Sequence, residues 1–153
     1  MVEAMIALSM LSIGLLGVFT LLANSTGLHR VASHQYIAAN LAAEGIEIVR
    51  SIADANHIQG SAWNAGLTGC ASGCSVEYSS AGLGSDQNNV LRLDDARGLY
   101  QYSTGKETPF KRVITITLPN PDELAVVSQV SWKDRGGIVL DVTIEDQFFN
   151  WRD

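Results

Sequence analysis

Apolar residues fill the beginning of the chain almost without interruption. Twenty consecutive residues from Ala4 to Ala23 carry no charge, and Glu3 is the only Asp, Glu, Lys or Arg before Arg30. As a helix, such a stretch extends about 30 Å, which matches the hydrocarbon core of a bilayer. A helix that is apolar on every side needs lipid or other helices around it. We therefore predict a hydrophobic helix over residues 1–24 that lies in a membrane or in a protein assembly.

A cleavable secretory signal is the alternative for this segment. Signals of that kind begin with basic residues, have a shorter apolar run and end at a small-residue cleavage site. Here an acid precedes the apolar run and no basic residue does, and the polar residues from Asn24 lead into a second helical segment. This order favours a retained anchor that continues into a structured helix.

Residues 25–55 become amphipathic, which predicts that the helix continues and covers a sheet. Apolar residues recur there at helical spacing. They are Leu28, Val31, Ala38, Ala42, Ile46 and Val49, flanked by Leu41, Ile48 and Ile52. Charged residues such as Arg30 and Glu47 lie mostly off this stripe. No proline interrupts the helix, and only Gly14 and Gly17 weaken its first half, so we predict a mostly continuous helix.

Residues 56–109 form a loop-rich connector with many Gly, Ser and Asn residues. Trp63 and Leu67 are the apolar residues expected to anchor this connector. Apolar and β-branched residues predict three short strands within it, at Ser75–Tyr78, Val90–Leu93 and Leu99–Tyr102.

Residues 110–146 carry the clearest β pattern. Apolar residues alternate along 110–118, and two further runs follow at 124–132 and 138–144, the last two joined by Lys-Asp-Arg-Gly-Gly. This predicts three antiparallel strands, with a hairpin at the end. The expected fold is therefore α+β, with a long N-terminal helix packed on an antiparallel sheet in a globular head of residues 25–153.

The charge balance argues against general nucleic-acid binding. The net charge is −6, whereas such proteins need a basic surface to neutralise phosphates. A local basic patch remains an alternative, since four cations lie near the later strands: Lys111, Arg112, Lys133 and Arg135. Solvated strand edges and turns are the favoured interpretation of these four residues.

Cys70 and Cys74 are the only cysteines, and they are four residues apart in a Gly/Ser-rich loop. A close, even pair is typical of a small disulfide in an exported protein. Closing so short a loop contributes about 2 kcal/mol to stability. A zinc site is the alternative, but it lacks a second cysteine pair.

We expect no catalytic residue, cofactor or metal site. The three histidines show no ligand spacing, and the Gly-x-Ser-x-Gly elbow of hydrolases is absent from the sequence. Oxygen-bearing side chains from Asp86 to Asn89, with Asp94 and Asp95, are a calcium alternative without the EF-hand spacing. Phe148, Phe149 and Trp151 form an apolar tail that either docks onto the head or contacts another subunit.

The residues from Met1 to Gly17 resemble the N-terminal signature of type IV pilins and pseudopilins. The shared order is an apolar pair, a single glutamate and a long apolar helix rich in small residues. A weaker similarity extends to Leu41–Arg50. In that family the glutamate, matched here by Glu3, neutralises the N-terminal amine of the adjacent subunit during assembly. The family glutamate is usually fifth in the mature protein, so we expect that this chain begins two residues inside the mature sequence, and that leader cleavage and N-methylation lie outside it.

The resemblance implies a pilin fold and a structural subunit without enzymatic activity. We expect a major pilin in a helical filament of identical subunits, held in the inner membrane before assembly and extracellular afterwards. Prepilin peptidase and the pilus assembly machinery are the further implied partners. Small residues allow helices to approach closely in a membrane. The candidates are Ala4, Ala7, Ser9, Ser12, Gly14 and Gly17, of which Ala7, Gly14 and Gly17 join Glu3 as predicted assembly residues.

Two alternatives share parts of this pattern. A minor pilin or a type II secretion pseudopilin would carry the same signature, but would cap or prime the fibre instead of building its length. An unrelated membrane-anchored extracytoplasmic binding domain or enzyme would need the apolar helix only as an anchor. Substitution of Glu3 would separate this last alternative from a filament subunit.

Overall fold

In a computed structural model of the chain, residues 2–80, 82–85 and 89–151 are described. The chain divides into two units, residues 1–35 and 36–153. We call the first the N-terminal segment and the second the compact unit. The described residues form one helix and five strands. The fold is therefore α+β, as predicted, and its order of elements is consistent with a pilin fold.

Helix α1 (Val2–Ile58) begins in the N-terminal segment and ends in the compact unit, and it has no break at Gly14 or Gly17. Glu3 in its first turn and His57 in its last turn suit the partial charges of the helix ends. The helix ends just before Gly60, whose φ of 68° lies in the left-handed region that favours glycine. The predicted continuous helix is confirmed.

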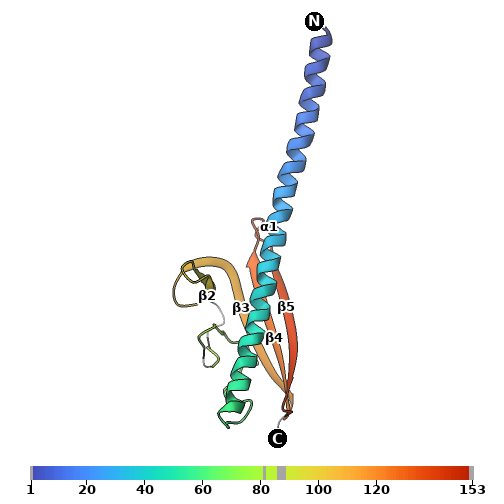
Figure 1. Cartoon of the computed structure of the whole chain (residues 1–153). Coiled ribbons are helices and arrows are strands. Elements are labelled where there is room, and N and C mark those ends of the chain that lie inside the picture. Colours follow the sequence, from blue (N-terminus) through green and yellow to red (C-terminus); the bar gives the residue numbers. More distant parts are fainter. Residues whose placement is uncertain (1, 81, 86–88, 152–153) are drawn as a thin grey trace. The chain divides into compact units, whose positions relative to one another are not determined.

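The compact unit also contains one five-stranded sheet (Figure 1). Its strands are β1 (Val90–Asp94), β2 (Leu99–Gln101), β3 (Lys106–Asn120), β4 (Glu123–Lys133) and β5 (Val139–Phe149). They lie in the order β2-β1-β3-β4-β5, and every neighbouring pair is antiparallel. The predicted hairpin is confirmed, with Lys133 opposite Val139 at its turn and Glu123 opposite Phe149 at its far end.

The core lies between the second half of α1 and the inner face of this sheet (Figure 1). The buried residues of α1 are Ala38, Leu41, Ala42, Gly45, Ile46, Ile48, Val49 and Ile52. They pack against alternate residues of β3 and β4, such as Ile114 and Val126. The predicted apolar stripe is thus correct from Ala38 onward, whereas Leu28 is exposed.

Gly45 sets the close approach of α1 to the sheet. A Cβ at this position would lie 2.6 Å from Ser128 Oγ and 2.8 Å from Ile114 Cδ1. Real Cβ atoms are essentially never found so close, so a side chain at residue 45 would force the Ser128 and Ile114 side chains or the helix itself to shift in a densely packed interior.

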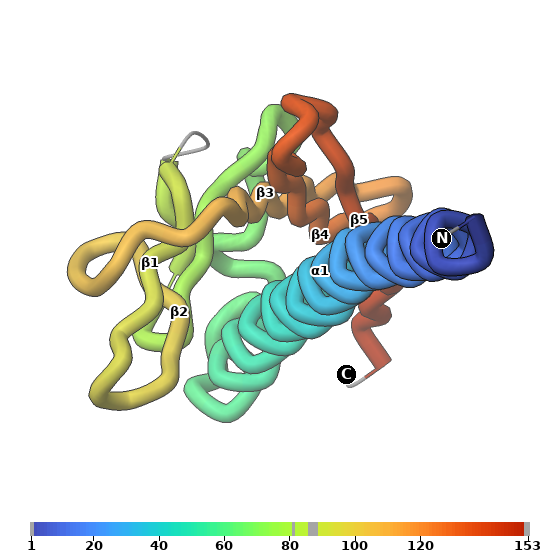
Figure 2. The backbone as a smooth tube through the Cα atoms, turned by 90° about the horizontal axis from the view of Figure 1, so that it is seen from above, coloured from blue at the N-terminus to red at the C-terminus, as the bar shows by residue number. Residues whose placement is uncertain are grey.

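The observed connector, of which residues 59–80 and 82–84 are described, comes beside β3 where Cys74 pairs with Ile114 (Figure 2). Leu67 is fully buried in the core and Trp63 is partly buried against it, as predicted. The predicted strand Ser75–Tyr78 is wrong, because this stretch makes only isolated bridges, Cys74 to Ile114 and Ser75 to Gly84. Frequent glycines let the backbone turn away after one or two pairs.

Candidate functional site

The N-terminal segment leaves its apolar side chains exposed. Every described side chain from Val2 to His29 is exposed, including thirteen large hydrophobic ones between Val2 and Leu22. The segment is long and apolar enough to cross a membrane, and none of its most apolar window is buried within the chain. A core helix of a soluble protein would be mostly buried, so this segment does not serve as one.

The free energy of leaving these apolar side chains in water decides whether the segment can remain uncovered. Burying one large aliphatic or aromatic side chain contributes about 1.5–3 kcal/mol. Thirteen such side chains therefore represent on the order of 20 kcal/mol or more. A whole domain is stable by only about 5–15 kcal/mol. The segment must therefore be covered by lipid or by protein outside this chain.

Polar hydroxyls within the apolar segment are satisfied by the helix itself. Ser9 donates to the carbonyl of Ile6 at 2.8 Å, and Ser12 donates to that of Leu8 at 2.7 Å. Thr20 and Thr26 make the same kind of bond to carbonyls three residues earlier. An unsatisfied polar group costs several kcal/mol in hydrocarbon, so these bonds make the segment compatible with an apolar environment.

Glu3 is an exposed carboxylate in the first turn of α1. Among the described residues no cation forms an ion pair with it. The next Lys or Arg along the chain is Arg30, about 40 Å away along the helix. A cation for Glu3 in an apolar environment would therefore have to come from outside the described helix.

The predicted assembly residues share one face of α1. At about 100° per residue, Glu3, Ala7, Gly14 and Gly17 fall within an arc of about 80°. The remaining close-approach candidates from the sequence lie at least about 100° from the centre of this arc. They are Ala4, Ser9 and Ser12. Gly14 and Gly17 have open space where a Cβ would be, so packing within the chain does not require glycine there. We call Glu3, Ala7, Gly14 and Gly17 the small-residue face; Met10 falls within the same arc.

Cys70 and Cys74 form a disulfide in the compact unit, with their Cα atoms 5.6 Å apart. Both are buried, and the backbone of Cys74 exchanges two hydrogen bonds with Ile114. The pair thus fastens the connector to β3. Among the described residues, no group of three His, Cys, Asp or Glu side chains gathers as a metal site would require.

Arg112 is the charged residue that sequence reasoning misplaced. Solvated strand edges and turns were the expected positions of Arg112, Lys111, Lys133 and Arg135, with a basic patch as the alternative, but the Arg112 side chain is fully buried. Strand alternation is the signal that could have placed it, because Phe110 and Ile114, two residues away on either side, face the core. Both interpretations are therefore wrong for Arg112.

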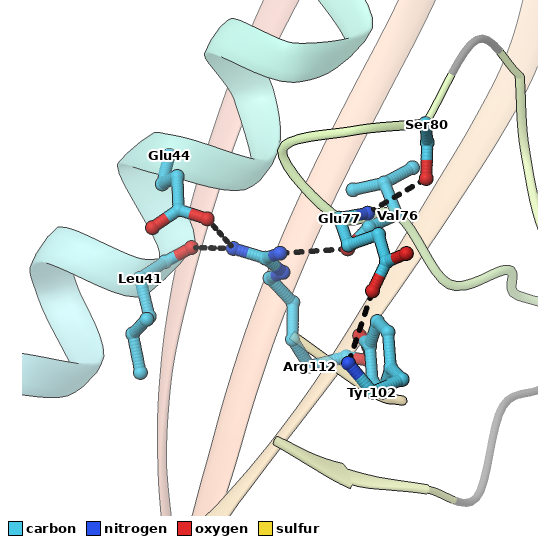
Figure 3. Close-up of polar contacts among 7 residues, drawn as sticks. All are labelled: Leu41, Glu44, Val76, Glu77, Ser80, Tyr102 and Arg112. Carbon is cyan, nitrogen blue, oxygen red and sulfur yellow. Dashed lines mark hydrogen bonds and ion pairs between the residues drawn. The ribbon is translucent and has the colours of Figure 1, made fainter. Parts of the chain in front are cut away.

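The Arg112 guanidinium joins three parts of the compact unit (Figure 3). Its Nη1 donates to the Leu41 carbonyl at 2.9 Å and to Glu44 Oε1 at 3.1 Å, both on α1. Its Nη2 donates to the carbonyl of Val76 in the connector at 2.7 Å. A buried charge is tolerated only with such partners, so Arg112 holds helix, connector and sheet in register.

Tyr102 continues this network at the edge of the sheet. Its hydroxyl donates to the Arg112 carbonyl at 3.3 Å, and its backbone N–H donates to Glu77 at 3.0 Å. Burial raises the pKa of the Tyr102 phenol above its ordinary value of 10.0, although the Arg112 charge opposes that shift.

Two other sequence candidates have different outcomes. Asp86, Gln87 and Asn88 of the calcium alternative lie outside the described residues, and Asp94 accepts a hydrogen bond from the Ala96 N–H within a turn. In the apolar tail, Phe148 is buried. The Cζ atom of Arg50 lies over the Phe148 ring, 5.4 Å from the ring centroid. Phe149 and Trp151 stay exposed. The tail therefore docks in part and presents two aromatic rings.

Comparisons of the chain with family models, with curated proteins and with solved structures find no match.

Proposed function

We propose that this chain is the major subunit of a type IV pilus-like filament. The observation that supports it best is the exposed apolar stretch of α1 behind a single acid, Glu3. In this proposal lipid covers the stretch before assembly, in the inner membrane. The same stretch is then covered by α1 helices of other copies in an extracellular filament.

Hydrophobicity alone does not bring helices together in a bilayer, because lipid tails are as apolar as leucine. Close backbone approach and polar pairing must supply the attraction. The small-residue face offers both, since Ala7, Gly14 and Gly17 allow close contact and Glu3 adds a charge on the same side. By resemblance to pilins, the partner of Glu3 is the N-terminal amine of the adjacent subunit.

The compact unit supports the same proposal from the other end of the chain. It holds a complete core of its own, closed by α1, the connector and the sheet. It thus needs nothing from the N-terminal segment to bury its apolar residues. A minor pilin or pseudopilin shares these features, and abundance separates them, because a major subunit dominates purified filaments.

The test is Glu3→Ala in a bacterium that makes the chain together with its assembly machinery. Sheared cell-surface material is examined by electron microscopy, and its subunit is identified and counted by mass spectrometry. We expect filaments to fall at least about tenfold while the chain remains in the membrane, since an unpaired buried charge costs about 3–5 kcal/mol.

Ser12→Ala is the matched control, because residue 12 lies about 180° from Glu3 on the same helix. It should leave filament yield unchanged. Normal filaments from Glu3→Ala would contradict the proposal, and so would sheared material that lacks this chain altogether. An anchored binding domain or enzyme would be indifferent to both substitutions.

A further inference from the structure

An aromatic groove lies at one end of the compact unit, with a volume of about 290 Å³. Its apolar wall includes Trp63 from the connector and Phe148, Phe149 and Trp151 from the end of the chain. Arg50, Asp54 and His57 of α1 also line the groove. The groove thus combines exposed rings with a polar rim, which is the composition of a protein contact.

Carboxylates outnumber cations around this groove. Arg50 is already bonded to Glu47 at 2.7 Å and to Asp146. Asp54 lines the groove, and Asp122 adjoins it through hydrogen bonds with Asn150. The groove is therefore acidic and suits a cationic apolar ligand.

The turn between β4 and β5 has the complementary character. Ile138 and Val139 are 64% and 58% exposed, although both are large aliphatic residues. Lys133 and Arg135 beside them are also exposed. Backbone hydrogen bonds between Asp134 and Ile138 and between Gly137 and Asp134, both 2.9 Å, hold the turn in shape. We call residues 133–139 the basic turn.

The basic turn cannot enter the groove of its own chain. Eleven consecutive residue pairs of the β4–β5 ladder, from Lys133–Val139 to Glu123–Phe149, separate the two features. At about 3.4 Å per residue they lie about 34 Å apart, at opposite ends of the sheet. A contact between them must join two copies, and because it uses different surfaces on each copy it can continue from copy to copy, into a ring or an open fibre.

We infer that the basic turn of one copy inserts Ile138 into the aromatic groove of the next, with Arg135 directed at the carboxylate of Asp54. This contact lies in the compact unit, and it names a second interface for the filament proposed above, on which it rests. It would cover the exposed ring of Phe149 and the exposed aliphatic residues of the turn with a second copy of this chain.

The experiment introduces Ile138→Cys together with Gln147→Cys into the full-length chain under filament-forming conditions. Gln147 is exposed and lines the groove. The native cysteines are already bonded to each other and buried. A disulfide forms only when Cβ atoms come within about 4.5 Å. We expect oxidation to give a ladder of dimers, trimers and longer chains, because each copy carries both halves of the contact.

Ile138→Cys with Thr143→Cys is the matched control, since Thr143 is exposed on the same strand and lies about 13 Å from Gln147. Its ladder should be at least about fivefold weaker. Arg135→Glu should lower the Ile138–Gln147 ladder about threefold to fivefold, as for an exposed ion pair, and adding Asp54→Lys should restore it.

Each other outcome overturns the contact. An equally strong ladder from Thr143→Cys means unspecific collision, and dimers from Ile138→Cys alone mean that the turns meet each other. Filaments without the Ile138–Gln147 ladder overturn this contact and leave the proposed function standing. Chains that stay in the membrane and form neither ladder nor filament overturn both.

Discussion

The Arg112 guanidinium occupies a core position because its strand alternates, and Phe110 and Ile114 on either side are also buried. Its charge is offset by two backbone carbonyls and by Glu44, a carboxylate that remains partly exposed. Its Nε has no hydrogen-bond partner among the described residues. The residue therefore fixes the positions of its partners more than it adds to stability, as buried ion pairs commonly do.

Tyr102, bonded to the Arg112 carbonyl, should make the compact unit sensitive to alkaline pH. Its pKa is raised in the folded state, so the folded chain holds the phenolic proton more tightly than the unfolded chain does. The resulting stability is complete below pH 10 and is lost as pH rises through the folded pKa, by at most about 1.4 kcal/mol per pH unit.

Urea unfolding of the detergent-solubilised chain between pH 9 and 11.5 measures this slope. Tyr102→Phe should give a smaller loss of stability over that range than the parent chain. Tyr36→Phe, at an exposed position, is the comparison and should follow the parent. Equal slopes for the parent and Tyr102→Phe would show that the phenol does not contribute. The pKa of Tyr100 is also raised, first by burial and then by Glu44, so some alkaline loss should persist.

Helix α1 lies close to the sheet at Gly45, so the packing of these two elements is sensitive to one methyl group there. Alanine normally stabilises a helix by about 1 kcal/mol over glycine. Gly45→Ala should instead destabilise the chain by about 1–3 kcal/mol, because the new Cβ overlaps Ser128 Oγ and Ile114 Cδ1. Thermal unfolding followed by circular dichroism gives the sign directly.

Gly27→Ala is the matched helix variant, since its Cβ would meet nothing within 4 Å. It should leave the melting temperature unchanged or raise it. Ser128→Ala added to Gly45→Ala removes the nearest atom and should recover part of the loss. A Gly45→Ala chain as stable as Gly27→Ala would mean that the helix does not lie so close to the sheet.

The pattern of apolar residues and the residue types along the chain predicted α1 and all five strands. They failed where structure depends on distant neighbours. Ser75–Tyr78 has the composition of a strand, yet it lacks a partner beyond two bridges. Gly45 reads as a weak point in a helix until the sheet beneath it is known. The shared face of Glu3, Ala7, Gly14 and Gly17 required only helical geometry, whereas the groove joins α1, the connector and the chain end.

The compact unit holds its core without the N-terminal segment, because every buried residue of α1 lies at Ala38 or later. A variant that lacks residues 1–28 should therefore remain in water without detergent as a folded monomer. Its melting temperature should match that of the compact unit in the full chain, and the full chain itself should require detergent or lipid. Size-exclusion chromatography with light scattering and thermal unfolding test both points. Aggregation or a non-cooperative melt of the shortened chain would show that the N-terminal segment contributes to the core.

The serine and threonine hydroxyls of α1 donate hydrogen bonds to carbonyls of the same helix, which matters if the helix is transferred from lipid to another environment. A side chain that bonded lipid headgroups, water or a neighbour would have to exchange that partner when the helix left the bilayer. The hydroxyls of Ser9, Ser12, Thr20 and Thr26 need no such exchange, because their acceptors are carbonyls of the same helix. Transfer of the helix out of lipid would therefore change the surroundings of its apolar side chains and of Glu3, but would leave these four hydrogen bonds intact.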